Sequence, residues 1–325
     1  MTQPLMAEIA KRQGLRRLAV LAGDPIADVY RAMPQRPEVI AFTSIHQRLQ
    51  WRHRSNQARQ LNREQFTHAL ILPHSIKSAL IPWLAGIPTR IGYLGEHRYG
   101  LINRRPQGKR IEARKQSMVR YFLGLVPGPS SDPAPEGKPS LMVDLAEVRA
   151  QQSRWLLRQY WAFAPGAEFG PSKQWPLAHW QRLITLLEPD QEVVILGGSR
   201  DRAFGQAIAQ AARPGQPIIN LCGQTTMAQA IALIAGAQLL LSNDSGLMHV
   251  AAALDRPQIA VFGSTDPDHS GPINPLALVH RLKLECSPCF ERHCPLGHHR
   301  CLQDIHPEVL ARDLSRISFN HPMLG

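Results

Sequence analysis

Residues 237–267 read AQLLLSNDSGLMHVAAALDRPQIAVFGSTDP, and this stretch decides the fold class. Its apolar residues 238–242 predict a strand, the turn 243–246 and the Ala-rich run behind it predict a helix, and residues 258–263 predict a second strand. This order forms one unit of a parallel sheet. The helix then begins at the carboxyl edge of the sheet. Its free N–H groups and positive dipole end face outward there, where such sheets bind phosphate-bearing ligands.

The same alternation of apolar runs and helical segments continues on both sides of that stretch. Further strands are predicted at 18–22, 38–42, 69–72, 160–164, 192–197 and 217–222, and helices at 52–63, 179–187 and 227–235. A Pro- and Gly-rich stretch at 126–140 is typical of a linker. The sequence therefore predicts an α/β protein of two domains, residues 1–150 and 151–325, each built on a parallel sheet covered by helices.

Composition and charge exclude several classes of protein. With 325 residues, 44% hydrophobic and 19% charged, the chain is neither disordered nor collagen-like. No apolar run reaches the roughly 18 residues that span a bilayer, and the N-terminus lacks the apolar core of a secretion signal. Five cysteines without such a signal indicate a reducing compartment. The net charge of +12 favours an anionic partner.

Three stretches carry a family resemblance. NDSGLMHVAAALDRP at 243–257 resembles the donor-binding signature of glycosyltransferase family 9, the lipopolysaccharide heptosyltransferases. PGAEFGPSKQWP at 165–176 is similar to that family's loop after the first strand of its C-terminal domain. LPHSIKSALIPWLAGIPTRIGYLGEHRYGLIN at 72–103 is similar to its acceptor-side segment. The resemblance runs in order through nearly the whole chain.

The resemblance implies a GT-B fold, two Rossmann-like domains facing a cleft, with the donor held mostly by the C-terminal domain. It implies inverting transfer of heptose from ADP-L-glycero-D-manno-heptose to the heptose of the lipopolysaccharide inner core (Kdo2-lipid A bearing heptose), with no metal cofactor. Such an enzyme would lie in the cytoplasm, peripheral to the inner membrane of a Gram-negative bacterium, and would bind no nucleic acid. Another family 9 transferase is the alternative within the family.

The donor candidates follow from matching positions. The resemblance implies that Lys173 contacts the leaving phosphate, that Asp244 binds sugar hydroxyls and that Ser245 and Gly246 offer amides to the pyrophosphate. Local alternatives are a solvated loop lysine for Lys173 and a simple helix cap for Asp244 or Ser245. Two further candidates follow in the same motif: Met248 would pack beside the ligand, and His249 is either a donor to phosphate or a packed histidine. Weaker candidates at other strand ends are Gly198, Asp201, Thr225 and Thr226. The two threonines are as readily explained as helix caps.

The acceptor side is expected to be cationic, because the acceptor carries phosphates and acidic sugars. Basic residues gather at His74, Lys77, Arg90, Arg98, Arg104, Arg105 and Lys109. Among these positions we select His74, Ser75, Lys77 and Arg98 as acceptor-binding candidates; ordinary surface charge is the alternative for each. A basic cluster also fits attraction to an anionic membrane surface.

The general base is not found at the family's position. The resemblance implies an Asp in a Gly-Asp step directly after the first strand, whereas residues 1–22 align with the helix and strand that follow it. We therefore expect a first domain without its first strand, in a chain that starts late or is truncated. Such a chain would bind ADP-sugar but transfer little. Asp24, after Gly23, mimics the dipeptide but follows what aligns as the second strand.

Four cysteines lie close together in the sequence near the C-terminus. Cys286, Cys289, Cys294 and Cys301 have the ligand type and density of a structural zinc site, and a reduced or disulfide-bonded loop is the alternative. Cys222, at a strand end, reads as a core residue. A basic, zinc-containing nucleic-acid-binding protein is the competing function. Against it, basic residues are spread over both halves and no aromatic-basic platform is present.

Overall fold

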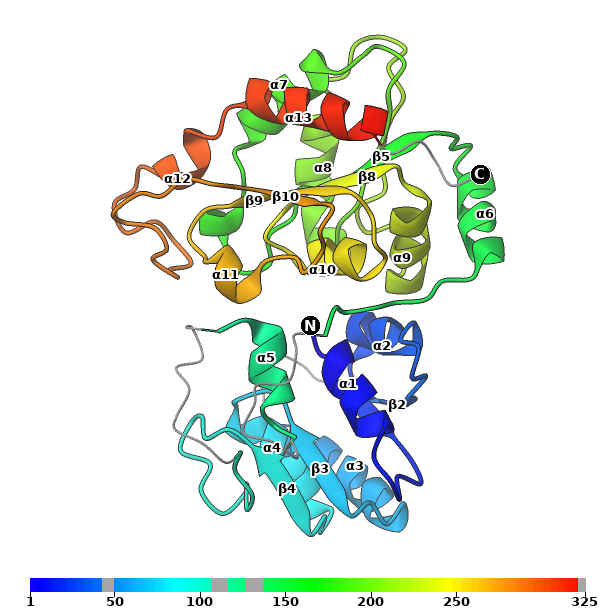
Figure 1. Cartoon of the computed structure of the whole chain (residues 1–325), viewed down its shortest axis with the longest axis vertical. Coiled ribbons are helices and arrows are strands. Elements are labelled where there is room, and N and C mark those ends of the chain that lie inside the picture. Colours follow the sequence, from blue (N-terminus) through cyan, green and yellow to red (C-terminus); the bar gives the residue numbers. More distant parts are fainter. Residues whose placement is uncertain (43–49, 107–115, 127–136, 321–325) are drawn as a thin grey trace. The chain divides into compact units, whose positions relative to one another are not determined.

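The computed structural model describes residues 1–42, 50–106, 116–126 and 137–320, which form two compact units. Unit 1 comprises residues 1–31 and 35–137, and unit 2 comprises residues 32–34 and 138–325 (Figure 1). The predicted boundary at residue 150 falls inside helix α6 (Leu145–Arg154), which belongs to unit 2. Residues 127–136 of the predicted linker, and Lys109, lie outside the described residues.

Unit 2 is built on one six-stranded sheet in which every neighbouring pair is parallel. The strands are β5 (Tyr160–Ala164), β6 (Glu192–Ile195), β7 (Ile218–Asn220), β8 (Leu239–Asn243), β9 (Gln258–Phe262) and β10 (Ala277–Arg281). Their order, β10-β9-β8-β5-β6-β7, is that of a doubly wound nucleotide-binding sheet. The five strands predicted for this half are confirmed. The edge strand β10, which has no fully buried residue and ends in the polar pair His280 and Arg281, was not predicted.

Helices cover both faces of this sheet because successive strand residues point to opposite sides. The helices are α6, α7 (Leu177–Leu186), α8 (Arg202–Ala209), α9 (Met227–Gly236), α10 (Gly246–Ala253), α11 (Pro267–Ser270), α12 (Arg300–Gln303) and α13 (Pro307–Asn320). Phe163 and Val261 pack with α7, α8 and α13, whereas Ala260 and Phe262 pack with α10. Figure 1 shows α7 and α13 on one side of the sheet and α10 on the other. The fully buried Trp175 and Trp180 anchor the first of these layers.

Unit 1 contains two pairs of parallel strands flanked by helices. Its elements are α1 (Gln3–Ala10), β1 (Ala19–Ala22), α2 (Asp24–Arg31), β2 (Glu38–Ala41), α3 (Trp51–Arg63), β3 (His68–Ile71), α4 (Ile76–Leu84), β4 (Thr89–Gly92) and α5 (Met118–Leu123). β1 pairs with β2, and β3 pairs with β4. The predicted strands 18–22, 38–42 and 69–72 and the predicted helix 52–63 are confirmed. Each observed boundary differs from the predicted one by no more than one residue. β4, with the sequence Thr-Arg-Ile-Gly, was not predicted because it contains no apolar run.

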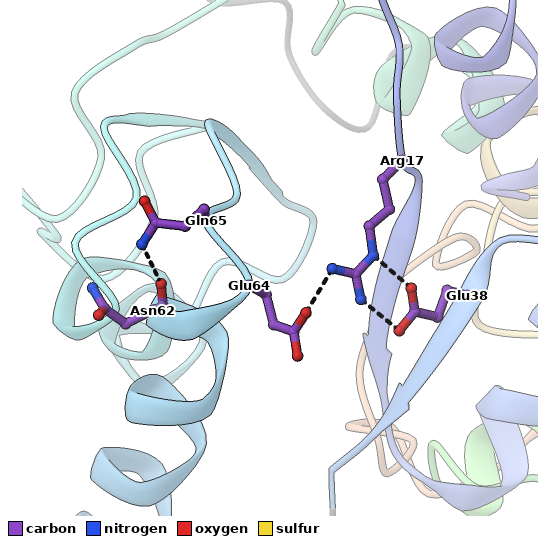
Figure 2. A network of polar contacts seen from close by, with 5 residues as sticks. All are labelled: Arg17, Glu38, Asn62, Glu64 and Gln65. Atoms are coloured by element: carbon purple, nitrogen blue, oxygen red, sulfur yellow. Dashed lines mark hydrogen bonds and ion pairs between the residues drawn. The ribbon is translucent and has the colours of Figure 1, made fainter.

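An exposed ion-pair network ties the first strand pair to α3 (Figure 2). Arg17 donates from Nε and from one terminal nitrogen to the two carboxylate oxygens of Glu38, both at 2.7 Å, and from the other to Glu64 at 2.7 Å. Glu64 follows the last residue of α3. The Arg17 guanidinium lowers the pKa of Glu38. The arginine therefore fixes the end of α3 against the sheet.

None of the helices in the described ranges has the length and apolar character needed to cross a membrane.

Candidate functional site

The two predicted donor-site segments meet at the centre of the unit 2 sheet. β5 and β8 are neighbours, and the chain continues from them toward opposite edges of the sheet. The loop that contains Lys173 follows β5, and the turn that contains Asp244 follows β8. Their carboxyl ends thus flank the topological switch point, where doubly wound sheets bind their ligands.

A buried ion pair joins these two segments. Lys173 Nζ lies 2.6 Å from Asp244 Oδ2, and Thr265 Oγ1 donates to the same oxygen at 2.6 Å. The side chains of Lys173 and Asp244 are only 15% and 5% exposed. Lys173 is therefore not the solvated loop lysine of the alternative interpretation. Because this cation and this carboxylate are in contact and shielded from solvent, they form a site with localised charges at the sheet edge.

Side-chain amide bonds hold the Lys173 loop in place. Asn243 Nδ2 donates to the carbonyl oxygen of Pro165 at 2.6 Å, and Asn243 Oδ1 accepts from the backbone N–H of Trp175 at 3.2 Å. Trp175 is fully buried, and its indole N–H donates to Ile305 O at 2.9 Å. One asparagine thus closes both ends of the loop onto β8.

The first turn of α10 keeps its donors uncapped. Ser245 is the N-cap residue, yet its side chain makes no cap bond, and its buried Oγ has no hydrogen-bond partner within the described part of the chain. Asp244 is engaged by Lys173 and Thr265 instead. The simple-cap interpretation is thus wrong for both residues. Gly246 is exposed, and a Cβ there would meet no atom within 4 Å, so open space lies over the helix N-terminus.

Met248 and His249 differ in position. Met248 is fully buried against Ala260 and Phe262, so it packs in the core under the site. His249 is half-buried in the first turn of α10. Burial lowers the pKa of His249, Asp244 opposes this shift and Lys173 adds to it. The imidazole is therefore neutral near pH 7 and can donate one hydrogen bond.

Asp201 lies at the rim of the same edge. Its Oδ2 accepts from the backbone N–H of Gly198 at 2.8 Å. A Cβ on Gly166 would come within 2.7 Å of the Asp201 carboxylate, so a larger residue there would have to displace that carboxylate. Thr226 caps α9 in a capping box with Gln229, whereas Thr225 is half-buried and makes no cap bond. The cap interpretation therefore holds for Thr226 alone.

The cysteine-rich segment supports the donor site directly. Phe290 N donates to Ser264 O at 2.7 Å, and Ser287 Oγ donates to Gly263 O at 2.7 Å. Ser264 and Gly263 directly precede Thr265 in the chain. Ser172, the neighbour of Lys173, donates from its backbone N–H to Arg292 O at 3.3 Å and from its hydroxyl to Glu291 O. No pattern in the sequence indicated that the cysteine-rich segment contacts the donor site.

Two cations of this region share one aromatic ring. Lys173 Nζ lies 5.0 Å from the ring centroid of Phe169, and Arg292 Cζ lies 5.3 Å from it. Gly170, between Phe169 and the lysine, has φ of 149°, and a Cβ there would lie 2.7 Å from Arg292 O. The loop can approach the cysteine-rich segment only because this residue is glycine.

The four clustered cysteines are free thiols and half-buried. Among the described residues, no group of three or more His, Cys, Asp or Glu side chains is arranged to hold a metal ion. Burial, and then charge on Cys289, Cys294 and Cys286, raises the pKa of Cys301 to about 11. Backbone N–H groups of residues 296–299, foremost that of His299, lower the pKa of Cys294. Cys222 is fully buried in the core, as predicted.

The acceptor candidates of unit 1 gather around the start of α4. His74 is exposed, and its Nε2 lies 2.7 Å from the hydroxyl of Tyr121, whose ring stacks on Tyr93 at 4.2 Å. Partial burial, and then the Arg98 charge, lowers the pKa of His74. Ser75 caps α4 by accepting from Ser78 N at 3.3 Å. Lys77 is half-buried in the first turn.

Arg98 has a different environment from the other acceptor candidates. It is fully buried, and its guanidinium donates to Pro73 O at 2.6 Å, Tyr93 O at 2.6 Å and Ser78 Oγ at 3.1 Å. It also reaches Ser75 O at 3.2 Å. Its donors thus hold the His74 loop against Tyr93 and point to main-chain oxygens rather than to solvent.

Asp24 begins α2 directly after β1 and is exposed. It therefore lies at the carboxyl end of the first strand pair, as a residue after a parallel strand must.

Several site residues were missed by sequence analysis. Thr265 follows β9 in a Gly-Ser-Thr turn, and the strand-end rule that selected Asp244 applies equally to it. Tyr93 and Tyr121 come from segments far apart in the sequence, and no local pattern connects them. Phe169 and Arg292 meet only in the folded chain.

Comparison with known proteins agrees with this geometry. Residues 54–300 match glycosyltransferase family 9 (heptosyltransferase). Lipopolysaccharide heptosyltransferase 2 of Escherichia coli K12 is 33% identical over 327 residues, which cover 98% of this chain and 94% of that protein. Lipooligosaccharide heptosyltransferase 2 of Haemophilus influenzae is 36% identical over 273 residues, which cover 78% of this chain and 77% of that protein. Both are of the heptosyltransferase II type, which the stretches 72–103 and 165–176 predict.

A solved structure of E. coli ADP-heptose LPS heptosyltransferase II superimposes with a TM-score of 0.85 at 32% identity, covering 98% of this chain and 94% of that one. The match confirms the predicted α/β fold of the GT-B class and disfavours the nucleic-acid-binding alternative. By sequence and by fold, the chain belongs to glycosyltransferase family 9.

Proposed function

We propose that this enzyme transfers heptose from ADP-L-glycero-D-manno-heptose to the inner-core heptose of lipopolysaccharide, with inversion at the anomeric carbon. The names of its relatives support the donor sugar and the acceptor class. The observation that carries the proposal is the buried Lys173–Asp244 pair beside the uncapped N-terminus of α10. It provides a cation and free amides for a diphosphate, and a carboxylate for a sugar.

The leaving ADP is stabilised by protein groups in this proposal. Lys173 moves from Asp244 to the pyrophosphate when the donor enters, and Ser245 and Gly246 offer their backbone N–H groups to the same oxygens. Asp244 then accepts from a sugar or ribose hydroxyl, and neutral His249 donates to phosphate. These fixed donors stabilise the charge that develops on the leaving group as the bond to the anomeric carbon breaks. The transfer needs no metal cofactor because these groups supply the positive charge.

The rim residues would contact the nucleoside. Gly198 and Thr225 follow β6 and β7, and the backbone N–H of Gly198 donates to Asp201. Backbone at Gly198 allows close approach of a ribose, and Asp201 accepts from its hydroxyl.

The acceptor is proposed to bind at the start of α4. His74, Ser75 and Lys77 face an anionic sugar with one neutral donor, one hydroxyl and one ammonium. Arg98 serves as a positioning residue, because its donors hold the loop that presents His74. The acceptor is a lipid, so the enzyme would work in the cytoplasm at the surface of the inner membrane.

The test is transfer in detergent. Purified enzyme is incubated with ADP-heptose and one of two acceptors, Kdo2-lipid A with one heptose or Kdo2-lipid A without heptose. The product masses are measured by mass spectrometry. A gain of one heptose only on the heptose-bearing acceptor supports the proposal. Transfer to the acceptor without heptose would assign the chain to another activity of the family, and transfer from another nucleotide sugar would overturn the donor.

A structural zinc ion in the cysteine-rich segment stays a prediction. Its support is the spacing of Cys286, Cys289, Cys294 and Cys301 in the sequence, whereas no three such side chains are arranged to hold a metal ion in the described part of the chain, and a reduced or disulfide-bonded loop is the alternative. Thiolates of this kind would take a soft divalent ion. Metal analysis of protein purified without chelator tests it: one zinc per chain is expected, and metal-free protein of full activity would contradict it.

A further inference from the structure

The two units differ completely in net charge. Residues 1–137 contain 21 Lys and Arg against 9 Asp and Glu, a net charge of +12, whereas residues 138–325 contain 16 of each. Basic residues occur in both halves of the chain, but only in residues 138–325 do acidic residues balance them. The whole excess of positive charge therefore belongs to unit 1.

Helix α3 presents a large part of that charge to solvent. Arg52, Arg59 and Arg63 are exposed and are spaced seven and four residues apart, which places them on one face of the helix. The opposite face, including Ala58 and Leu61, is buried. The thirteen residues of α3 include no Asp or Glu. The result is an arginine stripe with no acidic partner on its own helix.

The nearest acidic residue at the end of this helix is already engaged. Glu64, which follows Arg63, accepts from Arg17, and Arg17 also binds Glu38 (Figure 2). Among the described residues, Arg59 makes a long contact of 3.4 Å to the neutral Asn56. The stripe therefore keeps its positive potential for an external partner.

Large apolar side chains border the stripe. Trp51, at the start of α3, is 51% exposed. The neighbouring helix α4 exposes Ile76 at 41% and Trp83 at 45%, seven residues apart on one face. Glu96 lies at that end of α4, where it accepts from the backbone N–H of Ile76 at 2.9 Å.

The two helices lie side by side. Arg54 donates to Lys77 O at 2.8 Å near their N-termini, and Asn62 donates to Ala85 O at 3.0 Å near their C-termini. The exposed arginines of α3 and the exposed apolar residues of α4 therefore occur on adjacent helices of unit 1.

We propose that this docking face, formed by Trp51, Arg52, Arg59, Arg63, Ile76 and Trp83, rests on an anionic lipid surface. Arginines bind lipid phosphates, and tryptophan partitions into the headgroup region, where one side of the ring is wet and the other apolar. Exposed Ile76 and Trp83 favour a lipid surface over a nucleic acid, which offers no apolar layer. The inference rests on the proposed function, because a lipid-linked acceptor requires an enzyme at such a surface.

The test measures vesicle binding without substrate. The full chain is mixed with phosphatidylcholine vesicles with or without phosphatidylglycerol, and the bound fraction is measured by co-sedimentation at low and high salt. We expect binding only with phosphatidylglycerol. Neutralising the stripe in Arg52→Gln/Arg59→Gln/Arg63→Gln is expected to lower the partition coefficient about a hundredfold, at about fivefold per basic residue.

Matched controls separate charge and apolar contributions. Arg149→Gln/Arg312→Gln/Arg316→Gln removes three exposed arginines from unit 2 and should leave vesicle binding within about twofold. Trp51→Ser/Trp83→Ser should weaken binding at high salt too, whereas Leu145→Ser/Leu156→Ser, on exposed unit 2 positions, should not. Unchanged protection from heating by ADP shows that the variants are folded.

Three outcomes would overturn the docking face: no binding to phosphatidylglycerol vesicles, equal loss in stripe and control variants, or duplex DNA displacing the protein from vesicles at equal phosphate concentration. Transfer to acceptor dispersed in detergent is measured in parallel. The stripe variant should keep that activity and lose transfer to acceptor embedded in vesicles. If vesicle binding holds while no heptose transfer is found, the proposed function fails and the docking face stands.

Discussion

Unit 2 and unit 1 handle charge in opposite ways. Unit 2 has no net charge, and its key cation, Lys173, is buried in contact with Asp244. Unit 1 carries the entire +12; Arg98 is buried among hydrogen-bond acceptors, whereas Arg52, Arg59 and Arg63 of α3 are exposed to solvent. A few fixed donors in a dry site can bind a small anion. A large anionic surface is attracted by net charge that remains in solvent.

The largest expected effect comes from the buried cation of unit 2. Lys173→Ala should lower heptose transfer by at least about 100-fold, because the pyrophosphate loses the buried side-chain cation beside it. Affinity for ADP, measured by calorimetry, should fall with it. Lys283→Ala removes an exposed lysine from the same unit and should change neither quantity. Equal activity of the two variants would contradict the role given to Lys173.

The buried arginine of unit 1 should matter for stability. Arg98→Ala leaves the oxygens of Pro73, Ser75 and Tyr93 without their donor and should lower the free energy of unfolding by about 3 kcal/mol. Denaturant unfolding measures the loss. Arg105→Ala, at an exposed position of the same unit, should cost less than about 0.5 kcal/mol. Similar losses for both would show that Arg98 does not organise the loop.

A double-mutant cycle should separate folding from binding in unit 2. Asp244→Asn leaves the Lys173 ammonium buried without its counter-charge, and unfolding free energy should fall by about 2 kcal/mol. Adding Lys173→Met removes that charge and should recover most of the loss, without restoring ADP binding. Strictly additive changes in stability would mean that the two side chains do not interact in solution.

The smallest effect concerns two thiols of one segment. Backbone N–H groups lower the pKa of Cys294, whereas burial and neighbouring thiolates raise the pKa of Cys301 to about 11. At a given pH the thiolate fraction is therefore larger at Cys294 than at Cys301. Iodoacetamide should label Cys294 first, as followed by peptide mass spectrometry, and labelling of Cys301 should rise only at alkaline pH. Faster labelling of Cys301 would show a different arrangement of the segment.

The sequence predicted most of unit 2 because its strands are continuous apolar runs bounded by turns. The run at 160–164 is a strand at the same residues, and the turn at 243–246 is where α10 begins. Edge strands such as β10 were missed, because half-buried positions do not require apolar side chains. The packing of residues 286–292 against the Lys173 loop was also missed, since the bond between Ser172 and Glu291 joins segments 119 residues apart.

By itself, the sequence determined the α/β class, the strand-turn-helix that carries Asp244, and the family motifs. It also determined the charge of unit 1, since composition needs no folding. Only the tertiary structure decided that Lys173 is paired with Asp244, that Ser245 leaves α10 uncapped and that Arg98 is buried while Arg52, Arg59 and Arg63 of α3 are exposed. Local patterns follow from the periodicity of a strand or helix, whereas partners and exposure depend on which distant segments pack together.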